Sequence, residues 1–106
     1  MIIARMCWGR LRMEVNGHAQ HGTAGNDIVC AGASTLVYAL AETLRVAEER
    51  GRVEANVEDK DGTFVIWAEP SVYNLSEIKA YFRVCVIGFK LLQRQYPRNI
   101  EIREVQ

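Results

Sequence analysis

The chain has 106 residues and a mass of 12.0 kDa, enough for a single domain over residues 1–106 with one hydrophobic core. Thirteen basic and thirteen acidic side chains cancel, so nothing in the charge balance favours nucleic acid as a partner. No apolar run approaches the roughly 20 residues that span a bilayer, and the N-terminus lacks the apolar core of a signal peptide, so we expect no membrane partner.

The first predicted element is a β-hairpin at the start of the chain. Residues 2–7 are rich in strand-forming side chains, and residues 8–10 have the composition of a turn. Apolar and polar side chains then alternate over residues 11–16, which is the pattern of a half-buried strand. The second strand of this hairpin should therefore end just before His18.

A glycine-rich segment follows and leads into a predicted helix. Residues 17–34 read GHAQHGTAGNDIVCAGAS, and Asp27 is a favourable N-cap because its carboxylate accepts hydrogen bonds from unpaired backbone N–H groups. Apolar side chains recur at helical spacing over residues 28–50, and Gly51 is a natural C-terminal stop.

The second half of the chain predicts another hairpin and another helix. Residues 53–58 alternate in polarity, residues 59–62 form a turn, and residues 63–68 return as an apolar strand. Asn74-Leu75-Ser76-Glu77 has the form of a capping box, which predicts the start of a second helix. This helix should end before Pro97.

Residues 100–105 form the last predicted strand and complete the order ββαββαβ. Two helices of this length can cover one face of a sheet. The sequence therefore predicts an α+β two-layer sandwich, with both helices packed on one face of a small, mostly antiparallel sheet.

The candidate chemistry lies in the glycine-rich segment, where His18 precedes Cys30 by twelve positions. A thiol in the first turn of a helix feels the partial positive charge of unpaired N–H groups, which favours the thiolate. An imidazole nearby can take the proton and later return it to a leaving group. The pattern indicates a cysteine nucleophile with a histidine base. On the residues alone, an inert cysteine that packs as a small hydrophobic side chain remains the alternative.

Two further residues are candidates for supporting roles. Asp27 has a role as helix cap, and its carboxylate could also orient the imidazole and stabilise its charged form. Ser34 lies one helical turn after Cys30, so its hydroxyl can bond within the site or back to the Cys30 carbonyl. His21 is a rival base, ranked below His18 because it lies inside the glycine-rich segment.

A metal site is the competing chemistry for the same segment. His18, His21, Asp27 and Cys30 could supply zinc ligands, but a structural zinc usually draws on paired ligands a few residues apart, and the sequence has no such pair. The glycines are not followed by the Gly-Lys-Ser/Thr of a phosphate loop. We therefore expect neither a metal nor a cofactor.

The cysteines also bear on the cellular compartment. Their number is odd and their spacing wide, whereas small secreted domains carry dense, even sets. This favours reduced thiols in the cytoplasm. Cys7 on a strand and Cys85 on the apolar face of the second helix both fit the interpretation as buried, inert side chains.

A Gly17-His18-Ala19 motif is followed by Cys30 within DIVCA and by Ser34 four positions further on. This signature resembles the ribosomal-processing cysteine proteases (Prp) of Firmicutes and related bacteria. The agreement continues in the DKDG of residues 59–62 and the LQRQYP of residues 92–97, so the resemblance covers essentially the whole chain.

The resemblance implies a homodimeric α+β cysteine endopeptidase. Such proteins remove a short, mostly apolar N-terminal extension from the twenty-seventh large-subunit ribosomal protein, and they cleave after an aromatic residue. The resemblance gives His18 the role of base and Cys30 that of nucleophile, with Asp27 and Ser34 in support. It also implies a substrate-gating loop that contains the glycines Gly17, Gly22 and Gly25.

Two alternatives to this function remain open from the sequence. His21 and Gly32 depart from the common family pattern, and Gly32 should cost the helix about 1 kcal/mol relative to alanine. Relatives also occur beside phage head genes, which makes a capsid or scaffold precursor the alternative substrate. A non-enzymatic module that binds a peptide during ribosome or phage head assembly is the alternative from another class.

Overall fold

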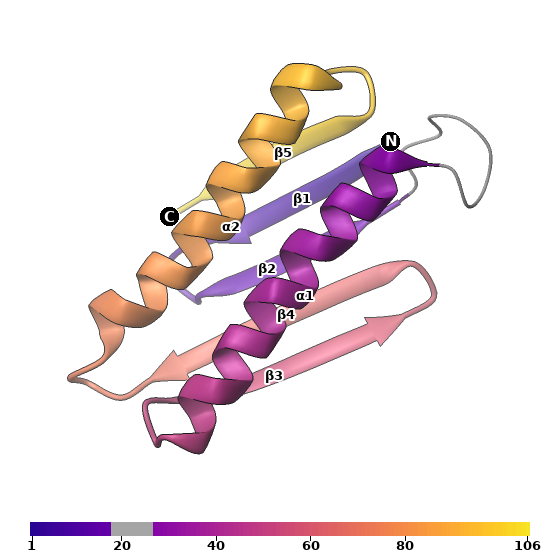
Figure 1. The fold of residues 1–106 in the computed structure, drawn as a ribbon. Coiled ribbons are helices and arrows are strands. Elements are labelled where there is room, and N and C mark those ends of the chain that lie inside the picture. Colours follow the sequence, from indigo (N-terminus) through magenta and orange to yellow (C-terminus); the bar gives the residue numbers. More distant parts are fainter. Residues whose placement is uncertain (18–26) are drawn as a thin grey trace.

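The computed structural model describes residues 1–17 and 27–106 and has the order ββαββαβ that the sequence predicts (Figure 1). Its elements are, in chain order, β1 (Ile2–Cys7), β2 (Arg12–Asn16), α1 (Ile28–Glu49), β3 (Val53–Lys60), β4 (Thr63–Pro70), α2 (Leu75–Gln95) and β5 (Ile100–Val105).

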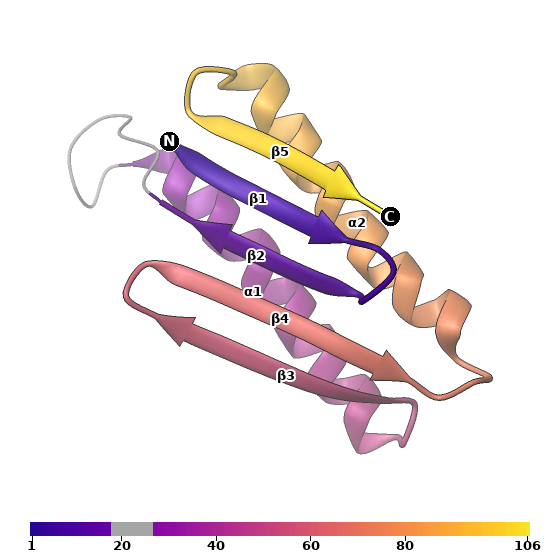
Figure 2. The ribbon, with the colours of Figure 1, turned by 180° about the vertical axis from the view of Figure 1, so that it is seen from behind.

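The strands form one sheet in the order β3-β4-β2-β1-β5. Three neighbouring pairs are antiparallel, and β1 pairs with β5 in parallel. Figures 1 and 2 show that both helices cover the same face of this sheet. The predicted α+β two-layer sandwich with a mostly antiparallel sheet is therefore confirmed.

The hydrophobic core lies between the helices and the sheet. Period-two alternation directs Ile2, Ala4 and Met6 of β1 toward the helices, where each is buried. From α2, the fully buried rings of Phe82 and Phe89 fill the same layer. The helices thus bury one apolar stripe each against the sheet.

Helix α1 is long and apolar enough to cross a membrane by length and composition alone. In this fold its apolar side chains recur every three or four residues and pack against the sheet, as in an amphipathic helix that buries one face. The buried members of this stripe are Val29, Ala33, Val37, Leu40, Leu44 and Ala47.

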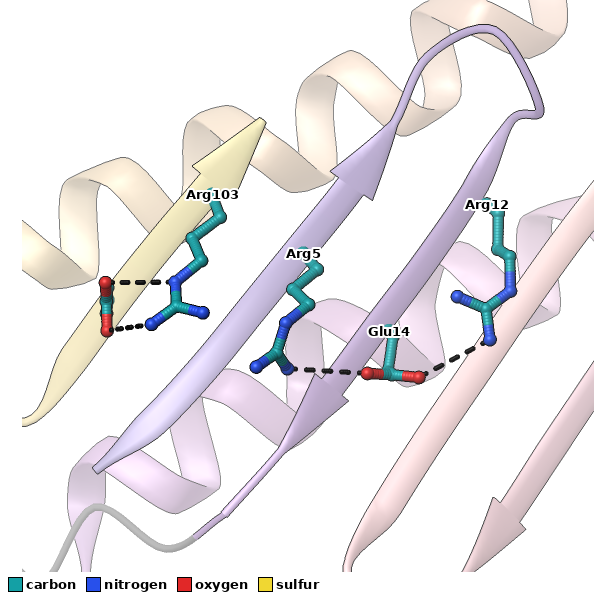
Figure 3. Close-up of polar contacts among 5 residues, drawn as sticks. Arg5, Arg12, Glu14 and Arg103 are labelled. Atoms are coloured by element: carbon teal, nitrogen blue, oxygen red, sulfur yellow. Dashed lines mark hydrogen bonds and ion pairs between the residues drawn. The ribbon is translucent and has the colours of Figure 1, made fainter. Parts of the chain in front are cut away.

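The other face of the sheet carries ion pairs (Figure 3). The Glu14 carboxylate lies between two arginines, with Oε2 3.4 Å from Arg5 Nη1 and Oε1 3.4 Å from Arg12 Nη2. On β5, the Arg103 guanidinium donates to the Glu101 carboxylate at 3.0 and 3.2 Å. Exposed pairs of this kind contribute little stability each. In the described part of the chain both helices lie on the opposite face, and these charged side chains stay partly exposed.

The β3–β4 turn is shorter than the sequence predicts. Asp59 and Lys60 belong to β3, and the turn consists of Asp61 and Gly62, with φ angles of 52° and 78°. Two central residues with positive φ match the right-handed twist of a tight hairpin. As a consequence, Asp59 occupies a strand position that faces α1 rather than the tip of a loop.

The predicted capping box at the start of α2 is wrong. The Asn74 side chain makes no capping bond to the helix, and its Oδ1 instead accepts a hydrogen bond from Ser71 Oγ at 2.5 Å. The Glu77 carboxylate pairs with Arg52 at 3.2 Å. Both side chains therefore have partners outside the first turn, which the local sequence pattern does not reveal.

Candidate active site

Cys30 lies in the first turn of α1 and is half-buried. Asp27 is the N-cap of this helix, and its Oδ1 accepts hydrogen bonds from the backbone N–H groups of Val29 and Cys30, both at 3.0 Å. The predicted capping role of Asp27 is therefore confirmed. The bond to the Cys30 amide also fixes the backbone that carries the thiol.

A pocket of about 260 Å³ opens beside Cys30, between the first half of α1 and the β3–β4 hairpin. Its apolar wall comes from the core side of the sheet and from α1, and its polar rim contains Ser34, Tyr38 and Asp59. The apolar residues of this wall are Ile2, Val15, Ala33, Val37 and Phe64. A largely apolar pocket with a few polar groups beside a nucleophile is the arrangement expected of a binding site for an apolar side chain.

Three pocket residues form a polar stripe along α1. Cys30, Ser34 and Tyr38 follow one another at four-residue intervals, so they share one face of the helix. The structure thus brings Ser34 to the Cys30 pocket, as the sequence predicts. Tyr38 was missed, although its spacing of two turns from Cys30 carried the signal.

Tyr38 is held by two contacts at the rim of this pocket. Its hydroxyl donates to Asp59 Oδ2 at 2.8 Å, and its ring meets Phe64 edge-on, with centroids 5.7 Å apart and planes at 88°. The hydrogen bond to the Asp59 carboxylate, together with its negative charge, raises the pKa of Tyr38 above the ordinary value. The phenol therefore remains a donor at neutral pH.

Gly17 follows the last residue of β2 and directly precedes the predicted base, His18. It has a φ of 95°, and a Cβ at this position would lie 2.2 Å from the Met1 carbonyl oxygen. Glycine is thus required here both by conformation and by close approach. His18, His21, Gly22 and Gly25 lie outside the described residues, so the Cys–His geometry and the gating loop stay predictions from sequence.

The other two cysteines lie away from this pocket. Cys85 is buried in the core, and desolvation raises its pKa to about 12, so its thiol stays protonated at neutral pH. Cys7 is only half-buried and lies on the ion-paired face of the sheet, with Sγ 3.8 Å from the Gln106 carbonyl oxygen. The prediction that Cys85 is buried is confirmed, whereas the prediction that Cys7 is buried is wrong.

A larger pocket of about 940 Å³ lies at the opposite end of the sheet, around the β1–β2 turn and the end of β4. Its described lining contains Trp8, Trp67 and Arg10, but neither cysteine nor histidine. The smaller pocket is therefore the candidate active site, because of the two it alone is lined by a cysteine.

Replacing Asp27 with alanine should lower the free energy of unfolding by about 1 kcal/mol, because two N–H groups of the first turn lose their acceptor. Urea denaturation measures this change. Asp27→Asn is the matched control, since an amide oxygen can still accept these bonds, and it should retain most of the stability. Equal losses in the two variants would contradict a capping role.

Comparisons with known proteins bear on this site. The family model described as cysteine protease Prp matches residues 3–101. The ribosomal processing cysteine protease Prp of Staphylococcus aureus (strain Mu50 / ATCC 700699) is 28% identical over 88 residues, which cover 83% of this chain and 80% of that protein.

Solved structures agree with this match. The crystal structure of an essential ribosomal processing protease Prp from S. aureus, in complex with a covalently linked product peptide, superposes with a TM-score of 0.77. The two share 26% identity, over 99% of this chain and 100% of that one. SMU.848 from Streptococcus mutans gives a TM-score of 0.68 and 25% identity, over 98% and 91% of the two chains.

Proposed function

This chain belongs to the Prp family of cysteine proteases, and we propose that it removes a short, mostly apolar N-terminal extension from the twenty-seventh large-subunit ribosomal protein. The observation that carries the proposal is the family match over residues 3–101, together with a cysteine at a helix start beside an apolar pocket. A relative with 26% identity is a ribosomal processing protease that holds a covalently linked product peptide.

In the proposed mechanism, Cys30 is the nucleophile and His18 the base. The Cys30 thiolate attacks the scissile carbonyl carbon, and the resulting tetrahedral intermediate collapses as the C–N bond breaks and His18 gives its proton to the leaving amine. Water then attacks the thioester, His18 takes a proton from it, and the acid product leaves with regeneration of the thiol. Asp27 and Ser34 support this chemistry from either side of Cys30 along the chain.

The pocket beside Cys30 supports cleavage after an aromatic residue. Apolar side chains of Val15, Val37 and Phe64 line it, and its volume of about 260 Å³ is large enough to enclose an aromatic ring. Burying such a side chain contributes about 2 kcal/mol to binding, and polar residues gain nothing comparable there.

The homodimer and the cytoplasmic location also belong to this proposal. Apolar side chains of α2 recur at helical spacing on its outer surface, with exposed fractions of 69% for Val84, 49% for Ile87 and 51% for Leu91. Such a stripe supports contact with a second copy. None of the three cysteines, all of which lie in the described part of the chain, forms a disulfide, which fits a reducing compartment that also holds ribosomal precursors.

The test is incubation of the protein with the precursor ribosomal protein of its own organism, followed by mass measurement of the new N-terminus. We expect loss of the extension through one cut directly after an aromatic residue. A precursor with aspartate in place of that aromatic residue is the control and should stay intact. Survival of the unaltered precursor would contradict the proposed substrate.

A further inference from the structure

We propose that Asp59, held in place by Tyr38, determines specificity by favouring substrate peptides with a cationic side chain three or four residues from the scissile bond. The inference rests on the proposed protease function and adds a second determinant to the apolar pocket. Asp59 is a specificity-determining residue in this scheme, and Tyr38 is a positioning residue that acts through it.

The register of the hairpin places Asp59 at the pocket. Asp59 of β3 pairs with Phe64 of β4, and both side chains face α1, where Tyr38 meets them. All three residues line the same pocket as Cys30. The neighbouring charged residues Glu58 and Lys60 occupy alternate strand positions and therefore face away from α1.

Asp59 gives the described lining of this pocket a net negative charge. Among the described residues of its lining, Asp59 is the only carboxylate, and no lysine or arginine is present. Its Oδ2 accepts the Tyr38 hydroxyl, and no ion pair joins Asp59 to a cation of the described part of the chain. A substrate cation would therefore meet an uncompensated carboxylate at the rim of an apolar pocket, where charge complementarity gives selectivity.

Tyr38 limits the freedom of this carboxylate. The 2.8 Å hydrogen bond fixes one oxygen of Asp59, while the edge-on contact with Phe64 fixes the tyrosine ring. An acceptor whose conformation is set before binding loses less entropy when the substrate arrives. The pair thus presents a fixed negative charge rather than a mobile one.

The spacing along α1 determines how far from the scissile bond a substrate side chain must lie to reach Asp59. Cys30 and Tyr38 are eight residues apart on the helix, which corresponds to about 12 Å at about 1.5 Å per residue. An extended peptide advances about 3.3 Å per residue. A substrate that runs from Cys30 along α1 therefore brings a side chain three or four residues from the scissile bond to Asp59.

The experiment measures peptide binding to the Cys30→Ala protein by fluorescence anisotropy. Each peptide contains one aromatic cleavage site, with lysine or glutamate placed at each of the four positions before and the four after it. We expect peptides with lysine three or four residues from the cut to bind about fivefold tighter than peptides with glutamate at the same position. The preference should weaken as salt is raised from 0.05 to about 0.5 M, because exposed charges are screened.

Substitutions then assign the preference to Asp59. Asp59→Asn keeps an oxygen for the Tyr38 hydroxyl but removes the charge, and it should bring the lysine-to-glutamate ratio close to one. Tyr38→Phe keeps the charge but frees the carboxylate, and it should give an intermediate ratio. Asp59→Glu keeps the negative charge and should therefore retain a preference for lysine over glutamate. Glu54→Gln removes an exposed charge from the same strand outside the pocket and is the matched control.

The results separate this inference from the proposed function. Three outcomes would overturn the inference. They are an unchanged lysine preference in Asp59→Asn, no lysine preference in the protein with Asp59 intact, and no peptide binding at all. Cleavage by the protein with Cys30 intact is measured on the same peptides. Binding through Asp59 without any cleavage would overturn the protease function alone, and cleavage that ignores Asp59 would overturn the specificity role alone. Circular dichroism confirms that each variant is folded.

Discussion

Replacement of Cys30 by alanine should reduce cleavage of the precursor by at least about 10³-fold, because no other group near the pocket can form the thioester. The side chain is half-buried in the first turn of α1, and alanine suits a helix, so the fold should survive. The measurement is the initial rate of precursor cleavage, with circular dichroism as the check on folding.

Three further variants test this assignment. His18→Ala should lose a similar factor, and the double variant should be little worse than either single one, because a nucleophile and its base act as a unit in the proposed mechanism. Cys7→Ser, which alters a half-buried thiol on the ion-paired face of the sheet, should cleave at the normal rate. A fully active Cys30→Ala protein would rule out the assignment of Cys30 as nucleophile.

Gly17→Ala should destabilise the protein by more than about 2 kcal/mol and also suppress cleavage. The new Cβ meets the Met1 carbonyl oxygen, a backbone atom that cannot rotate away, and φ is 95°. Relief of the contact must displace either the start of β1 or the end of β2, which lies two residues before His18. Urea denaturation gives the stability, and precursor cleavage by the folded fraction gives the effect on the site.

Gly51→Ala is the matched control for this variant. Gly51 also has a positive φ, of 72°, but a Cβ there would meet nothing within 4 Å. It should therefore cost only the conformational strain, about 1 kcal/mol, with normal cleavage by the folded protein. If the two alanine variants lost equal stability, the contact with Met1 would not be the cause.

The elements of the fold could be predicted because their signals are local. Period-two alternation over residues 11–16 and the apolar stripe of α1 survive in the structure, and both helices bury the predicted faces. The capping box failed because Ser71 and Arg52 compete for the side chains of Asn74 and Glu77. Such competition depends on tertiary neighbours, which no local pattern contains.

The same distinction between local signals and tertiary contacts applies to the candidate site. Cys30, Asp27 and Ser34 could be placed from sequence because they lie within two turns of one helix. Tyr38 and Asp59 meet only because α1 packs over the β3–β4 hairpin with a particular rotation, which the sequence leaves undetermined.

The hydrogen bonds from Val29 and Cys30 to Asp27 also occupy two amides that would otherwise be free to bind an oxyanion.

The parallel pairing of β1 with β5 has a consequence for synthesis of the protein. Ile2 pairs with Ile100 and Cys7 with Val105, so β1 has only β2 as a neighbour until β5 is added. Contacts between distant parts of a chain slow folding and form late. On the ribosome, β1 and β2 would emerge and remain without β5 until residues 100–105 had left the exit tunnel. The five-stranded sheet should therefore be complete only after residues 100–105 have been released from the exit tunnel.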